Sequence, residues 1–283
     1  MLRIAIQSKG RLYEESMALL EEAGIKIPGG KRTLLVPARN FPVEVLFLRD
    51  DDIPESVASG VADVGIVGLN EVMEKRCPVG ILKKLGFGKC RLSLAIPQDI
   101  DYQDRNWFSG KKIATSYPGI LSDYLHKNGI VSDIHVITGS VEIAPGIRLA
   151  DAIFDIVSSG STLVINRLKE VETVVESEAV LIGTDSISPE KRGILDELLF
   201  RFDSVQAADD KKYILMNVPQ KKLNDVLSVL PGIKSPTVMP LADKEWCSVH
   251  TVLDEKCFWE IINRLKTAGA EGILVLDIEK MIL

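Results

Sequence analysis

The sequence predicts an α/β protein with two lobes, followed by a smaller C-terminal domain of the ferredoxin-like βαββαβ type. Short runs rich in β-branched residues alternate with helical patterns over most of the chain, which is typical of sheets with helical crossovers. A strand expected at 179–184 follows the second group of strands and can return to the first lobe. From about residue 208 the order becomes strand, helix, strand, strand, helix, strand, which is the split βαβ unit.

The first lobe is expected to hold strands and helices in alternation. They are placed at 2–7, 11–24, 33–37, 41–49, 51–60 and 62–68. The helix over 11–24 repeats apolar or small residues at helical spacing and closes at Gly24. Pro54 and the acids before it are typical of a helix N-terminus. We expect this lobe to comprise residues 1–92 and 178–206.

The second lobe repeats the theme over residues 93–177. Strands and one helix are expected at 91–97, 111–117, 118–129 (the helix), 133–139 and 151–157. The segment 161–174 is expected to continue from a turn as a further helix. Two α/β lobes form a cleft, and such folds bind ligands at the carboxyl ends of their strands.

The last domain is expected over residues 207–283, after a polar linker at 204–212. Its elements are expected at 211–219, 220–232, 235–241, 246–254, 255–269 and 270–281. A small appended domain of this type more often binds a regulator or a partner than carries chemistry, although a fold alone does not decide this.

Composition narrows the function classes. The chain has 283 residues, 46% hydrophobic and 26% charged, with a net charge of −6, which argues weakly against a nucleic-acid partner. No apolar stretch is long enough to span a membrane and the N-terminus does not resemble a signal peptide. The cysteines are scattered without a CxxC pair, as in reduced cytoplasmic proteins. The three histidines, His126, His135 and His250, stand apart and do not advertise a histidine-based mechanism.

One stretch, DAIFDIVSSGSTL at 151–163, carries the sharpest chemical signal. Asp151 and Asp155 are four residues apart on an expected strand, so both should lie on one face near its C-terminal end. The turn from Ser158 to Thr162 offers N–H groups and hydroxyls that suit a phosphate. The carboxylates suit sugar hydroxyls or Mg²⁺. A sugar phosphate fits this arrangement, and an ordinary strand-to-helix turn with serine and threonine caps is equally compatible.

Other expected loops also follow strands. Lys9 and Arg11 flank Gly10 and suit an anion, or form a plain turn with solvated charges. Arg49 precedes three aspartates, of which one can cap the next helix and another can hold Arg49 or meet a metal–phosphate ligand. Further polar residues at strand ends are Gly68, Asn70, Thr115, Ser116, Tyr117 and Glu142.

Together these segments carry a resemblance to a known family. The segments QSKGRL, RDDDIP, DVGIVG, CRLSLA, KKIATSYP, GSVEIAP, DAIFDIVSSGSTL, SPTVMPL and ILVLDIEKM occur in this order over nearly the whole chain. The ordered set resembles the long-form ATP phosphoribosyltransferases, which catalyse the first step of histidine biosynthesis. The resemblance implies lobes like those of periplasmic binding proteins, a requirement for Mg²⁺, feedback inhibition by histidine at the third domain, and homodimers that convert into homohexamers.

The resemblance also implies a reaction and a set of site residues. N1 of the ATP adenine would attack C1 of phosphoribosyl pyrophosphate and release pyrophosphate. Phosphoribosyl pyrophosphate would be bound by Asp151, Asp155, Ser158, Ser159, Gly160, Ser161, Thr162 and Leu163. The catalytic groups would be Lys9, Arg11, Arg49 and Glu142, with Arg32 as a further helper. ATP and pyrophosphate would meet Lys9, Gly10, Arg11, Arg49, Asp50, Gly68 and Asn70.

The remaining implied ligands are Mg²⁺ and histidine. Mg²⁺ would be carried mainly by the substrate pyrophosphate, with Asp151 and Asp155 as candidate protein ligands. Histidine would contact Thr237, Ala270 and Ile273. Two other hypotheses compete with the transferase. A two-lobed solute-binding or sensing protein predicts an export signal or a DNA-binding domain, and a regulatory subunit without catalysis predicts a decayed 151–163 segment.

Overall fold

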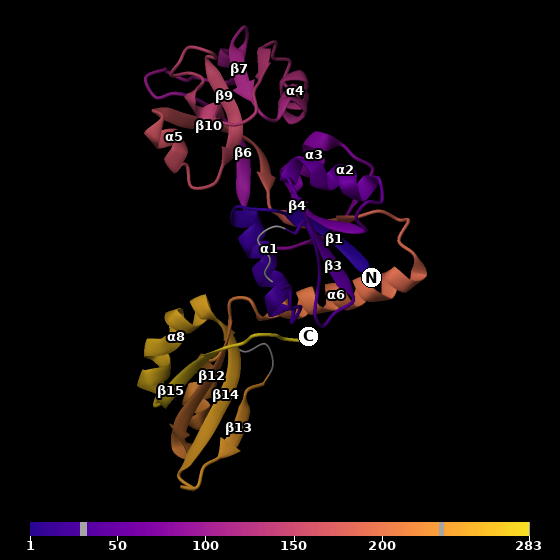
Figure 1. Cartoon of the computed structure of the whole chain (residues 1–283). Coiled ribbons are helices and arrows are strands. Elements are labelled where there is room, and N and C mark those ends of the chain that lie inside the picture. Colours follow the sequence, from indigo (N-terminus) through magenta and orange to yellow (C-terminus); the bar gives the residue numbers. More distant parts are fainter. Residues whose placement is uncertain (29–32, 232–234, 283) are drawn as a thin grey trace. The chain divides into compact units, whose positions relative to one another are not determined.

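The described residues form three β-sheets (Figure 1). The computed structural model describes residues 1–28, 33–231 and 235–282. Residues 1–197 form one compact unit that contains two of the sheets, and residues 198–283 form a second unit around the third sheet. The expected α/β fold class is therefore confirmed. Arg32, which was predicted as a further helper in catalysis, lies outside the described residues.

The first sheet has the strand order β2-β3-β1-β4-β11-β5. Its strands are β1 (Leu2–Gln7), β2 (Leu35–Pro37), β3 (Val43–Leu48), β4 (Val64–Gly68), β5 (Gly80–Lys84) and β11 (Ala179–Gly183). The central strands β3, β1 and β4 are parallel. Strand β4 is a continuous apolar run that is buried over nearly its whole length, whereas β3 has half-buried residues as well as buried ones. Strand β11 runs antiparallel to β4 and β5, which confirms the expected return to this sheet. Strand β5 was not expected, because a five-residue segment with two lysines carries a weak strand signal.

Three helices accompany this sheet. They are α1 (Arg11–Glu22), α2 (Ile53–Ala58) and α3 (Leu69–Lys75), with the 3₁₀ turn η1 (Asp50–Asp52) before α2. Helix α2 packs closely over Gly65 of β4, where an added Cβ atom would lie 2.6 Å from the Ile53 side chain. Helix α3 begins directly at Leu69, where a polar loop was expected, so that expectation is wrong.

The second sheet has the order β10-β6-β9-β7-β8. Its strands are β6 (Cys90–Pro97), β7 (Lys112–Thr115), β8 (Asp133–Val136), β9 (Ala152–Val157) and β10 (Leu168–Ser177). Helix α4 (Pro118–Lys127) belongs to the apolar core on one face, and the short helix α5 (Ser161–Ile165) contributes Leu163 to the other core. Figure 1 shows these two helices on either side of the strands. The 3₁₀ turns η2 (Arg105–Phe108) and η3 (Val141–Ile143) complete this part.

Strand β10 corrects the helix expected over 161–174. Helix α5 ends at Ile165, Arg167 adopts a left-handed φ of 55°, and the chain then pairs with β6. Two register irregularities in β10 leave Val171 and Val174 as extra residues in the ladder. These bulges put apolar residues three apart on the core side of a strand, so the strand imitates a helical period.

Helix α6 (Pro189–Ala208) corrects the linker expected at 204–212. The buried residues Leu195, Leu198, Phe202 and Val205 recur at intervals of three and four and form a continuous helical stripe. Most of the polar residues between them are exposed or half-buried, whereas Ser204 is buried. The boundary between the two compact units falls within α6.

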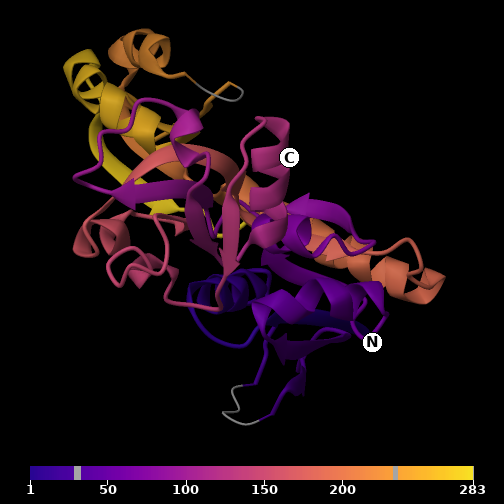
Figure 2. The same ribbon diagram turned by 90° about the horizontal axis from the view of Figure 1, so that it is seen from above.

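The second unit has a four-stranded antiparallel sheet of order β13-β14-β12-β15. Its elements are β12 (Lys211–Pro219), η4 (Gln220–Lys222), α7 (Leu223–Val229), β13 (Thr237–Pro240), β14 (Trp246–Asp254), α8 (Glu255–Ala268) and β15 (Glu271–Asp277). The connectivity confirms the expected βαββαβ domain. Helices α7 and α8, orange and yellow in Figure 2, contact each other and share one apolar core with the sheet.

Among the described residues, no helix is both long enough and apolar enough to cross a bilayer.

Candidate active site

The loop after β9 offers hydroxyl and N–H groups, as predicted. Ser158, Ser159 and Gly160 lie between β9 and α5, and we call them the β9–α5 loop. Gly160 has a φ of 79°, a left-handed conformation that strongly favours glycine. The Ser159 and Ser161 hydroxyls are 3.0 Å apart, and Ser158, Ser159, Ser161 and Thr162 are exposed. The Leu163 side chain, in contrast, is buried, so it anchors the segment in the core.

Asp151 and Asp155 do not lie together, which corrects their expected pairing at one end of the strand. Asp151 precedes β9, and its Oδ2 atom accepts a hydrogen bond of 2.9 Å from the Lys112 N–H. Asp155 lies in the second half of β9, so about 13 Å of extended chain separates the two residues. Only Asp155 is close to the β9–α5 loop in the chain, and the two carboxylates cannot share a metal.

Asp155 is a partly buried carboxylate with an acidic neighbour. Burial raises its pKa to about 6, its hydrogen bond from the Ile156 N–H lowers it, and the nearby charge of Glu142 raises it further. Glu142 lies on η3, which contacts β9. Two predicted site residues from different elements are therefore close enough for the charge of Glu142 to act on Asp155.

Arg11 links the first helix to the β9–α5 loop. Its Nη1 atom donates a hydrogen bond of 3.0 Å to the Ser158 hydroxyl, and its Nη2 atom donates one of 3.2 Å to the Lys89 carbonyl. Lys9 is exposed and forms no ion pair with any residue that the structure describes. Gly10 precedes α1 with a φ of 92°. The start of α1 and the β9–α5 loop, which are far apart in sequence, are therefore in contact through Arg11 and Ser158.

Arg49 is held by one of the three aspartates, as the surplus of acids suggested. Its Nε atom lies 3.2 Å from Asp51 Oδ1, and Lys75 lies 3.7 Å from the same carboxylate. The Arg49 side chain is 75% exposed, so its guanidinium remains accessible. Asp52 occupies the position before α2, but its side chain makes no capping hydrogen bond, which corrects the expected cap.

Asn70 is buried and its side chain already has partners. The Ser177 hydroxyl donates to its Oδ1 atom at 2.8 Å, and its Nδ2 atom donates to Glu71 at 3.0 Å and to the Tyr117 hydroxyl at 3.2 Å. Gly68 makes room for this side chain, because an added Cβ would lie 2.3 Å from Asn70 Oδ1. The side-chain amide of Asn70 therefore forms hydrogen bonds with other buried residues in this structure.

Glu71 is a functional candidate that the sequence reasoning missed, and its partner Tyr117 was predicted only as a polar residue at a strand end. The Tyr117 hydroxyl donates a hydrogen bond of 2.8 Å to Glu71 Oε1, and both side chains are buried. Burial raises the pKa of Glu71, and the charges of Asp50 and Asp51 also raise it. The pKa of Tyr117 is also raised, first by burial and further by the nearby charges of Glu71 and Asp155. No helix was predicted after the strand at 62–68, so the burial of Glu71 on α3 carried no signal in the sequence.

The same two helices make a second contact. Glu74 of α3 accepts hydrogen bonds of 2.8 and 2.9 Å from the Gly119 and Ile120 N–H groups in the first turn of α4. Arg76, at the end of α3, lies 2.7 Å from Asp123 of α4. These contacts join the first sheet's elements to those of the second sheet.

A cavity of about 460 Å³ lies beside the β9–α5 loop, where the chain passes between the two sheets. Its lining is largely charged. It comprises Leu69, Lys84, Lys89, Cys90, Arg91, Ser158, Glu176, Ser177 and Glu178. Two of the lining residues, Lys84 and Glu178, form an ion pair of 3.0 Å. Of the residues predicted for the site, only Ser158 lines this cavity.

The three residues predicted to bind histidine lie at the two edges of the second unit's sheet. Thr237 is exposed on β13, whereas Ala270 and Ile273 lie just before and on β15. Strands β14 and β12 separate these edges, so about 14 Å lies between them. Ala270 is 4% exposed and belongs to the apolar core. One copy of the domain does not bring these three residues around a single small ligand.

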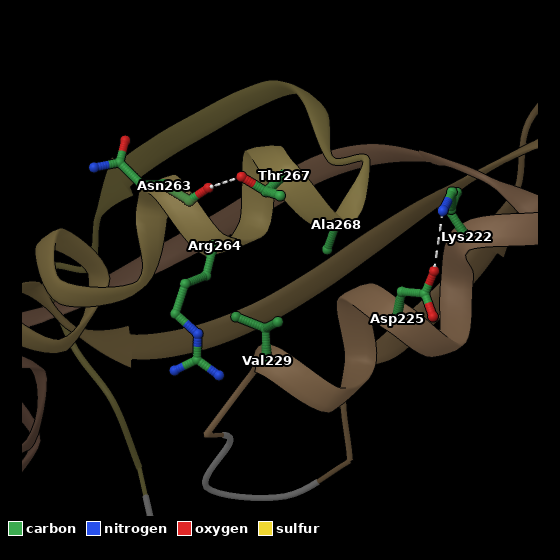
Figure 3. A pocket seen from close by; sticks show the side chains of 7 residues that line it. All are labelled: Lys222, Asp225, Val229, Asn263, Arg264, Thr267 and Ala268. Atoms are coloured by element: carbon green, nitrogen blue, oxygen red, sulfur yellow. Dashed lines mark hydrogen bonds and ion pairs between the residues drawn. The ribbon is translucent and has the colours of Figure 1, made fainter.

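The second unit also has a cavity of about 440 Å³ between its helices. Figure 3 shows Lys222 and Asp225 facing each other, 3.3 Å apart, while Arg264 projects from α8 on the side of Val229. The remaining lining residues are Asn263, Thr267 and Ala268. None of the three residues predicted to bind histidine lines this cavity.

The first unit fits a phosphorylated ligand whose charge is met by loop N–H groups, hydroxyls and arginines. In the part of the chain that the structure describes, no group of three or more His, Cys, Asp or Glu side chains is arranged to hold a metal ion.

Comparison with known proteins adds the family. A family model described as "ATP phosphoribosyltransferase" matches residues 49–204, and one described as "HisG, C-terminal domain" matches residues 208–280. The ATP phosphoribosyltransferase of Bacteroides fragilis is 70% identical over the full length of both chains. That of Cytophaga hutchinsonii is 57% identical over 99% of this chain and 98% of the other.

Solved structures show the same likeness. An ATP phosphoribosyl transferase (HisG:HisZ) complex from Thermotoga maritima has a TM-score of 0.62 and 27% identity, covering 71% of this chain and 96% of that chain. The substrate-binding protein of an amino acid ABC transporter has a TM-score of 0.50 and 11% identity, covering 73% and 93%. The second likeness concerns the fold alone, and it confirms the expected two-lobed, periplasmic-binding-protein-like architecture.

Proposed function

This chain belongs to the ATP phosphoribosyltransferase family, the pentosyltransferases that begin histidine biosynthesis, and we propose which of its residues carry the reaction. N1 of the ATP adenine attacks C1 of phosphoribosyl pyrophosphate, and pyrophosphate leaves with the electron pair of the C1–O bond. N1 carries a lone pair and no proton, so the attack needs no general base. The observation that carries the assignment is the hydrogen bond between Arg11 and Ser158, because it places a phosphate-binding cation on the hydroxyl-rich loop.

The β9–α5 loop, with Ser161 and Thr162, binds the 5-phosphate. Within the described residues, the N–H groups of Ser159 and Gly160 have no hydrogen-bond acceptor, so they are available to phosphate oxygens. Asp155 lies four residues before Ser159 and favours the positive charge that develops on the ribose as the C1–O bond stretches. Asp151 is left out of this assignment, because its carboxylate lies at the other end of β9.

Lys9, Arg11 and Arg49 meet the pyrophosphate and the ATP phosphates. Their exposed cationic groups would stabilise the charge that grows on the leaving pyrophosphate. Mg²⁺ carried by the substrate pyrophosphate would neutralise part of that charge when bound, and these three cations would complement it. Glu142 lies near Asp155 and contacts a ribose hydroxyl or the adenine amino group.

Histidine acts as a feedback inhibitor on the second unit. The separation of Thr237 from Ala270 and Ile273 on opposite sheet edges supports a histidine site completed between two copies of the chain. Such a site would couple inhibitor binding to the conversion of homodimers into homohexamers. The four free cysteines support a cytoplasmic location.

The test is a direct assay with ATP, phosphoribosyl pyrophosphate and Mg²⁺, in which ultraviolet absorbance follows phosphoribosyl-ATP and a pyrophosphatase pulls the reaction forward. Product that histidine suppresses supports both assignments. Product without suppression supports only the catalytic one. A folded protein that binds either substrate without forming product would contradict the transferase assignment and favour a binding role.

A further inference from the structure

Arg91 and Glu170 form an ion pair whose guanidinium also contacts the β9–α5 loop. We propose that this pair orients the peptide between Ser158 and Ser159, which makes Arg91 a positioning residue for the 5-phosphate. The inference rests on the function proposed above. Arg91 belongs to the segment CRLSLA, but the sequence predicted no role for Arg91 or Glu170, because their contact is visible only once the strands are assembled.

The sheet places Arg91 beside the point where β9 ends. Arg91 of β6 is in register with Val157 of β9 on one side and with Glu176 of β10 on the other. Val157 is the last strand residue before the loop. Arg91 Nη1 donates a hydrogen bond of 3.2 Å to the Ser158 carbonyl oxygen. The guanidinium thus holds the first backbone carbonyl after the strand.

Glu170 fixes the guanidinium in turn. Arg91 Nε and Nη2 each donate a hydrogen bond of 2.5 Å to the two oxygens of Glu170, a fork that lysine cannot make. The carboxylate also accepts from the Ser93 hydroxyl at 2.7 Å and from the Thr173 hydroxyl at 3.2 Å. The hydrogen bonds from Arg91 lower the pKa of Glu170 to about 2, so the pair stays charged at neutral pH.

A held carbonyl determines the direction of the next N–H. The peptide unit is planar and trans, so the Ser158 C=O and the Ser159 N–H point in opposite directions. The contact with Arg91 therefore turns the Ser159 N–H away from the guanidinium, and that N–H has no acceptor among the described residues. Arg11 restrains the Ser158 side chain separately, through its hydroxyl. The first residue of the loop is fixed at two different atoms.

The Arg91–Glu170 pair differs from a second ion pair on strand β10, which Glu172 forms. Glu172, two residues further along β10, lies 3.9 Å from Arg105 and accepts hydrogen bonds from Tyr102 and Tyr124. None of these hydrogen bonds and ion pairs involves the β9–α5 loop. Arg91 also has most of its donors committed to Glu170 and Ser158, so it acts on the phosphate through the backbone.

The test compares Arg91→Lys and Glu170→Gln with the control Arg105→Lys in the full chain. We expect each of the first two variants to raise KM for phosphoribosyl pyrophosphate about tenfold, since a charged hydrogen bond contributes roughly a factor of ten in affinity. KM for ATP and the thermal midpoint should stay near the native values. The double variant should be no worse than the single ones, because the two residues act as a unit. The control should leave both KM values unchanged.

Titration calorimetry with ribose 5-phosphate and with pyrophosphate separates the two substrate phosphates. Arg91→Lys should weaken the binding of ribose 5-phosphate about tenfold and leave that of pyrophosphate unchanged. Equal loss for both ligands, or no change in either, overturns the inference. If the native protein forms no phosphoribosyl-ATP, the proposed function fails instead, and the ribose 5-phosphate titration still decides whether Arg91 orients a phosphate loop.

Discussion

Arg11 Nη1 donates a hydrogen bond to the hydroxyl of Ser158, although the two residues are 147 positions apart in the chain. Arg11 begins the helix after the first strand, and Ser158 follows a strand of the second sheet. The contact therefore joins the two lobes at the loop that we assign to the 5-phosphate. A cation in this position can move from a serine hydroxyl to a phosphate oxygen when the substrate binds.

Replacing Arg11 with glutamine should lower kcat/KM by roughly 10²–10³, because the charge that stabilises the leaving pyrophosphate is lost. Arg11→Lys should restore part of this loss, since it keeps the charge without the fork. Arg76→Gln is the matched control: Arg76 also joins the two lobes, through Asp123, but lies away from the β9–α5 loop. Equal losses in the Arg11 and Arg76 variants would show that only lobe contact matters.

Asp155 should give the reaction a pH dependence. Its pKa is raised to about 6 by burial, so kcat/KM should rise with pH through about 6 as the carboxylate forms. Asp155→Asn should lower kcat and flatten this limb of the profile. Asp151→Asn is the control, because Asp151 lies at the other end of β9 and should keep the native profile. An unchanged profile in Asp155→Asn would remove the carboxylate from the mechanism.

The same substitution should stabilise the folded protein. A raised pKa means that the native state holds the proton more tightly than the unfolded state, so stability is present below about pH 4 and is lost as pH rises through about 6. At pH 8, Asp155→Asn should raise the free energy of unfolding by about 1–3 kcal/mol. Urea denaturation at pH 5 and pH 8 checks the sign, because the gain should be smaller at pH 5.

Tyr117→Phe should destabilise the protein by about 1–3 kcal/mol. The variant removes the hydroxyl that donates to Glu71 and accepts from Asn70, and it leaves a buried carboxyl with fewer partners. Urea denaturation measures the effect. Tyr13→Phe is the matched control, because the Tyr13 ring packs on Phe47 and its hydroxyl has no hydrogen bond to a described residue. Similar losses in the two variants would contradict the importance of the Glu71 network.

Gly65 and Gly193 should respond in opposite directions to alanine. At Gly65 the new methyl group would lie 2.6 Å from Ile53 and 3.0 Å from Val57, so helix α2 must shift at a cost of about 1–3 kcal/mol. At Gly193, inside α6, nothing lies within 4 Å, and alanine should stabilise by about 0.5–1 kcal/mol. Thermal unfolding of both variants checks the prediction, which fails if Gly65→Ala is as stable as the native chain.

Residue patterns predicted most elements because local signals and the fold agree. The run LRIAIQ became β1 and the 151–157 run became β9, since short β-branched runs suit strands buried on both faces. Strand β10 escaped prediction because two bulges give its apolar residues a helical spacing. The β9–α5 loop was located from its glycine and hydroxyls, which are local features.

The long-range parts of the site could not be read in the same way. Arg91 meets Glu170 and Tyr117 meets Glu71 only because strands and helices distant in sequence are neighbours in space. The prediction that Asp151 lies beside Asp155 was wrong for a related reason. A spacing of four residues was taken to bring both aspartates to the strand end, but the strand begins after Asp151. Where a strand starts depends on its neighbours in the sheet.

Regulation should depend on Thr237 and not on the cavity between α7 and α8. Thr237→Ala should raise the histidine concentration needed for half-inhibition about tenfold or more and leave the uninhibited rate unchanged, because Thr237 lies on the exposed edge strand β13 in a unit separate from the β9–α5 loop. Thr267→Ala is the matched control, since Thr267 lines the other cavity of the same unit. Inhibition curves and light scattering with and without histidine give the two readouts. If Thr267→Ala relieves inhibition and Thr237→Ala does not, the inhibitor binds between the helices, and a site completed by two sheet edges is wrong.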